Sequence, residues 1–593
     1  MIVNWTSSSQ ELEGTAFHLT RNFEFVTLAQ MSPPDSYRPP TKKTSSAFSI
    51  LNNPKFVSAI FQFLDFNVSC SRSRQACLKI GLTSKALLPY ALDILWRELF
   101  HLDRLIQILP DVKAVEFCHP GEENLKRQLF LDVLLVPSML ERLKFYSRRV
   151  KVFYHQEKTS TNLFTSIDPS IIMQIVSLLP SNEPLFPSLQ TLHLSTPLDR
   201  SRVVPFTPHI SRLFLSPSLE SVSFRLSGTQ LADVDTHSPN VWLFLQGITR
   251  TRPEMLQNLD LGFVLPPQYL APCFSSFTSL EFLKLPTGGH SREILRHVAG
   301  LPNLLSLSVT LGEWKSNSEA DRESHMMTFE RLRILSLDAD VESTRALLFS
   351  FHFPCLEKLD LSHIDRDMMD EGYWEGLVEN IASSLPHLCS LSFDYRSRDP
   401  KNGLQSYQAF PWRCFEHTIY MPFLTDLVIK KPKVESLSND DFSCMAHAWP
   451  HLVHLNIATE KLGDIDFRVL IMAESRLRHL RSLELSIQMA GAWVPIAPIA
   501  PHELRSLRVP FLLRDDEDDE DEDEDYSLRL SMEEQCEIAD FLDTLFPMLD
   551  TKTFYKDKEK ERSGLGPCMD KLVTRLQHAR RRQTTMFLRD SSR

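Results

Sequence analysis

The sequence predicts an α/β fold in which short strands and helical returns alternate along a solenoid. The first observation is a short sequence motif, called the phrase below, with the spacing apolar–x–x–apolar–x–apolar; it is clear at Leu189, Leu192 and Leu194. The second is that the phrase returns eleven more times, at intervals of 24 to 37 residues. The third is that its last two apolar residues alternate with polar ones, as in a strand with one buried face. The phrases begin at Leu189, Leu219, Leu256, Leu280, Leu304, Leu332, Leu356, Leu388, Leu424, Leu452, Leu480 and Leu504.

A single copy of the phrase cannot bury its own apolar face, so the copies are expected to stack into a continuous core. Helix-like runs that end at proline separate several copies, as in residues 293–302 and 378–386. A strand and a helical return at this spacing are typical of a leucine-rich-repeat solenoid, or horseshoe. The asparagine that usually follows the strand is missing and Gly numbers only 17, which favours the longer, helix-backed kind of repeat. An ordinary leucine-rich α/β domain is the alternative, and twelve copies in register disfavour it.

Composition indicates an intracellular protein, cytoplasmic or nuclear or both. The 593 residues are 42% hydrophobic and 24% charged, as in ordinary globular proteins. No run approaches the roughly 18 apolar residues of a membrane span, and no secretory signal pattern is seen at the N-terminus. The ten cysteines are scattered without metal-ligand spacing, which fits reduced thiols. We therefore expect no membrane association.

The net charge of −12 is concentrated in one segment. Asp515 to Asp525 are eleven consecutive carboxylates, so the remainder carries only about −1. A broad basic field of the kind that binds nucleic acid is therefore not expected.

The N-terminal part divides into two segments. Residues 1–47 are rich in Ser, Thr and Pro and are expected to be disordered; Met31 is a second candidate start. Residues 48–109 are expected to form three short helices. The apolar positions of these helices are Pro54, Ile60, Phe61 and Leu64 in the first, Leu78 and Leu82 in the second, and Leu92, Leu95, Trp96 and Leu99 in the third.

These positions resemble the F-box, a small all-α module. In that family the module binds the Skp-type adaptor of a cullin–RING ubiquitin ligase, and fungal members often place leucine-rich repeats after it. The resemblance implies adaptor contacts at Pro54, Ile60, Phe61, Leu64, Leu78, Leu82, Leu95 and Trp96. The alternative is that these helices only cap the end of the solenoid, since terminal repeats need a polar outer face.

The solenoid is expected over residues 110–513, with degenerate first repeats. Val112, Val115 and Phe117 echo the phrase, and Leu140, Leu143 and Phe145 echo it again. The step of 49 residues from Leu140 to Leu189 leaves room for an insertion or a missed copy.

Three segments follow the last repeat. Residues 514–527 hold the acidic run, expected to be either a solvated loop or a dock for a basic partner. Residues 528–555 are expected to form a capping helix, and 556–593 a basic tail. In the tail Arg580 to Arg582 are either an exposed cluster or a nuclear-import signal. The apolar face of the helix is expected at Ile538, Phe541, Leu542, Leu545 and Phe546.

No catalytic, metal or cofactor motif stands above chance, so an enzyme is not expected. His451 and His454 lack a carboxylate or cysteine at ligand spacing and are interpreted as scaffold residues. The expected binding surface is the concave strand face, for an unidentified protein target. Its central row contains no aromatic anchor: His193, Ser223, Asp260, Lys284, Ser308, Ser336, Asp360, Ser392, Val428, Asn456, Glu484 and Arg508.

Two functions are therefore expected from different classes. The first is the substrate-recognition subunit of a Skp/cullin/F-box-type ubiquitin ligase, with the adaptor and through it a cullin as partners. The second is a leucine-rich-repeat scaffold for protein–protein interaction with no ubiquitin link. Co-purification with the adaptor separates the two.

Overall fold

The computed structural model describes two compact units of the 593-residue chain. Unit 1 holds residues 1–220 and 224–230, and unit 2 holds residues 221–223 and 231–593. The structure describes residues 2–4, 24–26, 55, 57, 59, 61, 71–117, 126–156, 164–180, 183–197, 208–227, 238–288, 291–312, 314, 327–362, 371–394, 410–435, 437–459, 465–485, 487, 502–508, 532–546, 548–549, 574 and 577.

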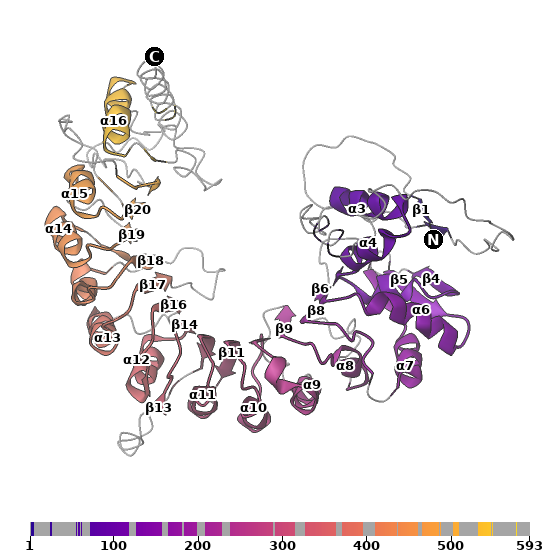
Figure 1. Ribbon diagram of the computed structural model, residues 1–593. Coiled ribbons are helices and arrows are strands. Elements are labelled where there is room, and N and C mark those ends of the chain that lie inside the picture. Colours follow the sequence, from indigo (N-terminus) through magenta and orange to yellow (C-terminus); the bar gives the residue numbers. More distant parts are fainter. Residues whose placement is uncertain are drawn as a thin grey trace, which may run out of the picture. The chain divides into compact units, whose positions relative to one another are not determined.

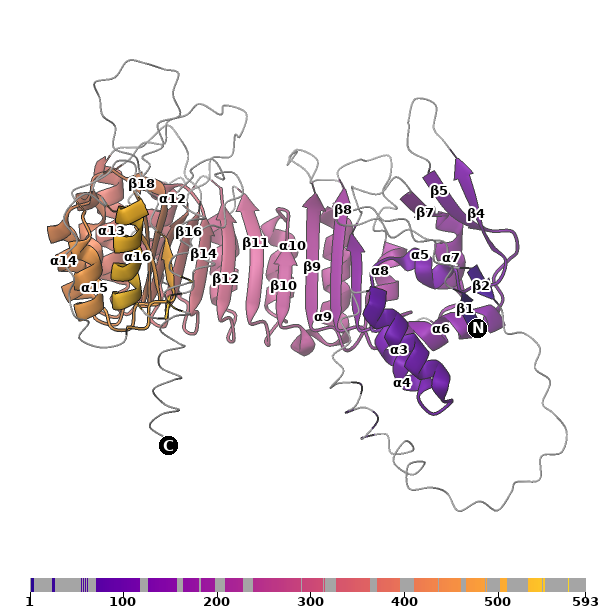
Figure 2. The same cartoon turned by 90° about the horizontal axis from the view of Figure 1, so that it is seen from above.

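Unit 2 is built on parallel strands that run side by side in one direction (Figure 2). Strand β9 (Ser221–Ser227) is divided between the units. Ten further strands in the described part of unit 2 follow one another in chain order, and the two-residue strands β13 (Met327–Thr328) and β15 (Phe351–His352) pair separately. The ten are β10 (Asn258–Leu261), β11 (Phe282–Gly288), β12 (Ser306–Leu311), β14 (Ile334–Asp338), β16 (Lys358–Ser362), β17 (Ser390–Asp394), β18 (Asp426–Val434), β19 (His454–Thr459), β20 (Ser482–Leu485) and β21 (Ser506–Arg508).

The repeated phrase sets the strand register, as the sequence predicts. Every one of the twelve strands begins two residues after the first leucine of its phrase. The second apolar residues then pair across the sheet, for example Leu335 with Leu359 and Leu359 with Leu391. These side chains are buried because strand periodicity turns them all to the same face. Stacked leucines on neighbouring strands thus form the continuous core that the spacing requires.

A backbone ladder closes the turn into each strand. The carbonyl of Glu357 accepts hydrogen bonds from the N–H groups of Cys389 and Ser390, at 2.8 and 2.9 Å. The carbonyl of Cys389 in turn accepts from Thr425 and Asp426, at 2.7 and 3.1 Å. The same pair of hydrogen bonds recurs at the carbonyls of Arg97 and Lys151 and at each repeat from Gln257 to Arg481, in every case at the residue just after the first apolar position. Main-chain groups therefore satisfy this edge without an asparagine side chain.

Helices lie on the side of unit 2 opposite its strands (Figure 1). Prolines end the returns at the positions that the sequence predicts, after α11, α13 and α14. Side-chain caps fix two of the starts: Asp340 accepts from the N–H of Ser343 at 2.6 Å, and Ser438 forms a capping box with Asp441. The elements are α9 (Ser238–Thr251), η2 (Pro253–Met255), α10 (Pro267–Phe274), α11 (Ser291–Ala299), α12 (Val341–Ser350), α13 (Glu371–Ser384), η5 (Trp412–Tyr420), α14 (Asn439–Ala448) and α15 (Arg468–Arg476).

Helix α16 (Met532–Leu545) has the buried face that the sequence predicts. Ile538 and Leu542 are almost fully buried, as are the neighbouring apolar positions. The Phe541 ring meets Phe467 edge-on, with ring centroids 6.0 Å apart, and Phe546 meets His502 in the same way at 5.3 Å. The helix therefore packs against the last repeats and shields their apolar residues from water.

Unit 1 contains two repeats that the twelve-copy register omits. Strand β6 (Val152–Gln156) pairs in parallel with β8 (Thr191–Pro197), and β3 (Glu98–Leu99) pairs in parallel with β6. Their phrases begin at Val150 and Trp96, each two residues before its strand. The long step before Leu189 thus contains a missed copy.

The expectation of two degenerate repeats in this region is wrong. Val112, Val115 and Phe117 lie in β4 (Val112–Phe117), which pairs antiparallel with β5 (Lys126–Leu131) in a separate sheet completed by β7 (Phe164–Ile167). Leu140, Leu143 and Phe145 lie in helix α6 (Pro137–Ser147). The spacing of three residues between Leu140 and Leu143 suits one face of a helix as well as the phrase, and the helix prevails here; Phe145 lies off that face and is 38% exposed.

The expected third helix of the N-terminal module is also shorter than predicted. Helix α4 (Leu88–Leu95) ends before Trp96, and Leu99 belongs to β3 rather than to the helix. It packs against α3 (Ser71–Thr83) at very close range, since a Cβ built on Gly81 would lie 2.5 Å from Ala91 Cβ. The remaining elements of unit 1 are β1 (Ile2–Asn4) and β2 (Glu24–Val26), an antiparallel pair, with α5 (Leu102–Ile106), α7 (Pro169–Leu178) and α8 (Pro208–Phe214).

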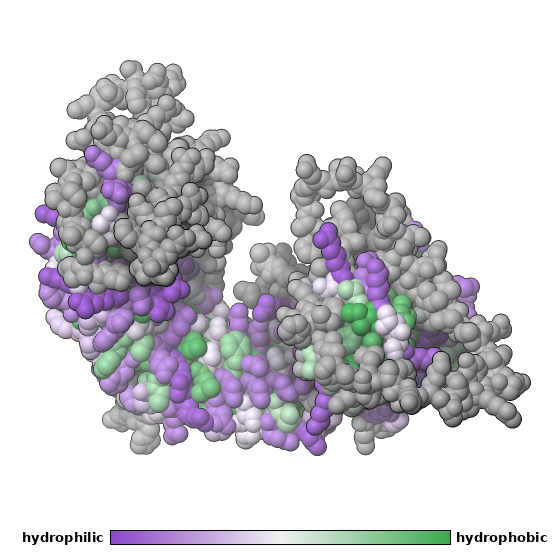
Figure 3. Space-filling model, turned by 45° about the horizontal axis from the view of Figure 1, so that its top comes forward, coloured by the Kyte–Doolittle hydropathy of each residue, from purple (hydrophilic) through white to green (hydrophobic). Residues whose placement is uncertain are grey.

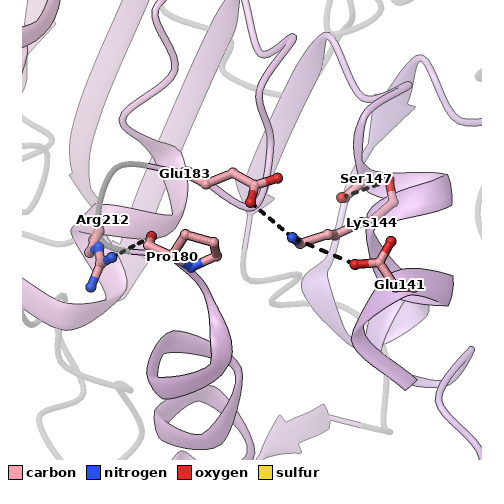
Figure 4. A network of polar contacts seen from close by, with 6 residues as sticks. All are labelled: Glu141, Lys144, Ser147, Pro180, Glu183 and Arg212. Atoms are coloured by element: carbon pink, nitrogen blue, oxygen red, sulfur yellow. Dashed lines mark hydrogen bonds and ion pairs between the residues drawn. The ribbon is translucent and has the colours of Figure 1, made fainter. Parts of the chain in front are cut away.

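A polar network ties successive helical returns of unit 1 together (Figure 4). Lys144 on α6 lies 2.8 Å from Glu183 in the segment after α7, and 3.8 Å from Glu141 one turn earlier. Arg212 on α8 donates to the carbonyl of Pro180 at 2.6 Å. The segment after α7 is therefore held from both sides.

Candidate functional site

The strand face of unit 2 is polar and hydrogen-bonded within itself. In the central row, four residues after each first leucine, Ser336 Oγ donates to Asp360 Oδ2 at 3.3 Å. Asn456 Nδ2 donates to Glu484 Oε2 at 2.7 Å. Nearer the N-terminal end, Ser223 Oγ donates to Asp260 Oδ2 at 3.1 Å. Donors and carboxylates on adjacent strands thus satisfy one another across the row.

Two cations on the same face are paired with carboxylates. Lys358 Nζ lies 3.1 Å from Asp360 Oδ2, and Lys430 Nζ lies 3.9 Å from Asp394 Oδ2. In the view of Figure 3, hydrophilic and apolar residues are interspersed on the visible described part of unit 2. This face therefore has the character of a polar rim rather than of an energetic centre.

The sequence missed one such pair. His454 Nε2 lies 3.8 Å from Asp426 Oδ1 on the neighbouring strand, although no carboxylate stands near it along the chain. A histidine and one carboxylate do not complete a metal site. Within the described ranges no group of three or more His, Cys, Asp or Glu residues is arranged to hold a metal ion.

The strand face of unit 1 carries an aromatic ladder: Phe100, Tyr154 and His193. These residues occupy the central row on three neighbouring repeats. The Phe100 and Tyr154 rings are stacked with centroids 5.3 Å apart and planes at 15°, and Tyr154 and His193 are stacked at 4.8 Å and 5°. All three side chains are partly exposed. The expectation of a row without an aromatic anchor is therefore wrong for this unit.

The ladder presents a neutral phenol. Burial raises the pKa of Tyr154, and the carboxylate of Glu98 on β3 raises it further. The hydroxyl therefore stays protonated at neutral pH and can donate a hydrogen bond to a partner. Because each face of the Tyr154 ring is covered by a neighbouring ring, the side chain offers its edge and its hydroxyl outward.

The candidate adaptor residues are distributed between core and surface. Phe61 is only 4% exposed and packs with Val57, Cys77 and Ala91 in the core of the helical module. Leu95 packs against that core while partly exposed, and Leu78 is also partly exposed. Leu82 is 55% exposed. Three candidates, Pro54, Ile60 and Leu64, lie outside the described residues.

Trp96 lies in the repeat stack rather than on the module surface. Its ring packs against Tyr146 of α6 with centroids 4.9 Å apart. Phe61 is likewise stacked on Tyr90 at 6.4 Å. The structure thus brings Leu78, Leu82 and Leu95 to the surface of α3 and α4, and places Phe61 and Trp96 in internal contacts.

The described thiols are not arranged for nucleophilic chemistry. Burial raises the pKa of Cys77, Cys273 and Cys414 to about 11, so these groups are thiols at neutral pH. The described cysteines are unpaired, in keeping with the expected reduced state. No helix in the described part of the chain is long and apolar enough to cross a membrane. The acidic run and Arg580 to Arg582 lie outside the described residues.

Comparison with known proteins identifies no family. No family model matches the chain, and no curated protein matches it. Among solved structures, TLR13 in complex with ssRNA13 is 14% identical, with a TM-score of 0.27 over 64% of this chain and 48% of that chain. A protein from Bacteroides fragilis is 15% identical, with a TM-score of 0.25 over 41% of this chain and 67% of that one. This chain spans about half the length of the TLR13 chain. Neither likeness carries an argument about function.

Proposed function

We propose that the chain is the target-binding subunit of a Skp/cullin-type ubiquitin ligase. In this proposal the strand face holds a protein target and the helices α3 and α4 dock the Skp-type adaptor. Ubiquitin transfer belongs to other subunits, and this chain supplies proximity and orientation. The proposal has two separable parts, target binding and adaptor binding, and each rests on its own observation.

The aromatic ladder carries the target-binding part. Tyrosine and phenylalanine are enriched at the energetic centres of protein interfaces because they bury much area with few rotatable bonds. Tyr154 adds a hydroxyl that can donate to a partner carbonyl or carboxylate. The strand face of unit 1 carries a partly exposed aromatic centre, and the strand face of unit 2 carries hydrogen-bonded polar residues. Both kinds of surface support recognition of a protein.

The experiment on target binding compares two partly exposed central-row residues. Tyr154→Ala is expected to weaken capture of the target at least about tenfold, as for an interface hot spot. Ser392→Ala, in the same row on β17, is the matched control and is expected to leave capture unchanged. Targets are first identified by a photo-crosslinking residue at position 193 of the purified chain. Equal capture by both variants would remove the ladder from the interface.

The exposed leucine on α3 supports the adaptor-binding part. Leu82 is 55% exposed, while α3 and α4 keep a small core of their own beneath it. Leu82→Asp is expected to abolish stoichiometric binding of the purified Skp-type adaptor without unfolding the module. Lys79→Asp, an exposed change on the same helix, is the control. If the unaltered chain does not bind the adaptor, the proposal that it is a subunit of a Skp/cullin-type ubiquitin ligase is excluded.

A leucine-rich-repeat scaffold without a ubiquitin link is the second candidate. The contact of Trp96 with Tyr146 of α6 favours it, because the end of α4 then packs against the repeats and the module can serve as their cap. This candidate keeps the target prediction at Tyr154 and loses the adaptor prediction at Leu82. The two binding experiments therefore distinguish the candidates.

A further inference from the structure

The residue that follows the first apolar position of each repeat lies in the backbone ladder and points its side chain to the turn edge of the stack. In unit 2 two cations of this row, Arg333 and Arg481, are paired with carboxylates. Arg333 Nη1 lies 3.4 Å from Glu357 Oε1, and Arg481 Nε donates to Glu503 Oε2 at 3.2 Å. The charges of Arg333 and Arg481 are therefore compensated within the chain, whereas Arg505, the next row member, has no ion pair among the described residues.

The same row in unit 1 is not balanced. Arg97 and Lys151 are consecutive members of it, since the N–H of Lys151 donates to the carbonyl of Arg97 at 2.9 Å. Both side chains are exposed, and neither forms an ion pair within the part of the chain that the structure describes. Like charges on adjacent strands repel each other, so this arrangement costs the isolated chain stability.

The end of helix α6 adds two more cations beside this pair. The guanidinium of Arg149 lies 4.1 Å from the centroid of the Phe145 ring and pairs with Asp93 of α4 at 2.8 Å. The guanidinium of Arg148 lies 5.0 Å from the same centroid and has no carboxylate partner among the described residues. Phe145 itself is 38% exposed.

We propose that this basic edge, formed by Arg97, Phe145, Arg148, Arg149 and Lys151, binds an acidic segment of a partner protein. Arg97, Arg148 and Lys151 lack a carboxylate partner among the described residues and lie at the starts of two adjacent strands and at the helix end just before one of them. A segment bearing aspartate or glutamate would complement them. The site does not include the aromatic ladder, and the ion pair of Arg149 with Asp93 connects it to helix α4.

The geometry favours a protein segment over nucleic acid. Base stacking needs an open aromatic face, and guanidinium groups already lie against the Phe145 ring. Three open cations also form a small patch compared with the long basic tracks that follow a nucleic-acid backbone. An extended peptide repeats its side chains on one side about every 6.6 Å, which suits cations spread over two neighbouring strands and a helix end.

The test uses the full chain and two labelled peptides of equal length, one alternating Glu and Ser and one alternating Gln and Ser. The parent chain is expected to bind the Glu peptide alone, and binding is expected to weaken as salt rises. Arg97→Gln combined with Lys151→Gln is expected to reduce affinity about four- to twentyfold, because each surface ion pair is worth about two- to fivefold. The control is Arg333→Gln with Arg481→Gln, which alters the same row where the cations are paired, and less than a twofold change is expected.

Thermal unfolding gives a second readout. Removing a repulsive pair is expected to leave the melting temperature of the Arg97→Gln, Lys151→Gln variant unchanged or raised, whereas a structural role would lower it. The proposal is overturned if the parent chain does not bind the Glu peptide, or if the control pair weakens binding equally. It is also overturned if a single-stranded oligonucleotide or a vesicle of anionic phospholipid competes as well as the Glu peptide, because the edge would then be a general anion surface.

Discussion

Replacing Leu361 by alanine tests whether the stacked leucines form the core of unit 2. Leu361 lies on β16, is 2% exposed, and pairs with Leu337 on one side and Phe393 on the other. Truncating a buried leucine loses the transfer free energy of the removed methyl groups. It also leaves a cavity, because the two neighbouring strands cannot both move to fill the space. The expected loss in the free energy of unfolding is therefore about 2–5 kcal/mol. Because neighbouring repeats stabilise one another, the loss is expected to spread to both adjacent repeats.

Urea unfolding followed by tryptophan fluorescence measures this loss directly. Trp374 reports on the same region, because the centroids of the Trp374 and Phe393 rings lie 5.9 Å apart and Phe393 is the strand partner of Leu361. Ile334→Ala is the matched control: Ile334 stands on β14 in the outward-facing row and is 39% exposed. We expect it to cost less than about 1 kcal/mol. A loss below about 1 kcal/mol for Leu361→Ala, or equal losses for the two variants, would refute the assignment of the core.

Three further predictions concern the module, the C-terminal cap and the acidic run. Gly81→Ala is expected to destabilise the helical module by about 1–3 kcal/mol, measured by limited proteolysis, because the added Cβ would meet Ala91 Cβ at 2.5 Å; full protease resistance would contradict this. His502 accepts a hydrogen bond from the N–H of Leu504 at 3.1 Å and burial lowers its pKa below 6.5, so the folded state favours the neutral ring. Its contribution to stability is present above that pH and is lost as the pH falls, so melting temperatures between about pH 5 and 8 should show this dependence in the parent and less of it in His502→Gln. Replacing Asp515–Asp525 by a Gly/Ser linker is expected to leave the melting temperature unchanged, and a fall of several degrees would show that the run supports the fold.

The regular part of the fold could be predicted because one short-range pattern determines both burial and register. The leucine at the first position and the apolar residues at the fourth and sixth positions predict the first residue of each of the twelve strands. The two repeats at Trp96 and Val150 escaped detection because aromatic and β-branched residues replace leucine in them, and each has a histidine at the sixth position. Tryptophan and valine fill the same core position, but they do not stand out in a search for repeated leucines.

The errors at β4 and α6 have a different cause. Leu140 and Leu143 are buried on one face of a helix, and a spacing of three residues suits both the helix and the repeated phrase. For β4, the pattern of apolar residues identifies a strand but not its partner. Antiparallel pairing with β5 depends on the intervening chain returning to the same place, which local spacing does not encode.

The candidate binding surface could be predicted in kind but not in detail. The polar character of the row in unit 2 follows directly from residues such as Ser336 and Asp360. The ladder was missed because Phe100 and Tyr154 belong to the two undetected repeats. The approach of His454 to Asp426 spans 28 residues along the chain, and only the completed register shows that the two side chains are neighbours.

The backbone ladder at the turn edge is formed by main-chain groups, although the Thr425 hydroxyl also donates to the carbonyl of Cys389. Since one carbonyl per repeat accepts two N–H groups, the fold makes no demand on what projects from that residue. Arginine, lysine, glutamate, cysteine and threonine all occupy the position in different repeats. A mutation there changes the charge sequence of the edge and leaves the stack intact. The edge is thus a surface on which new partner specificities can arise through single substitutions, each tolerated by the fold before it is useful to the cell.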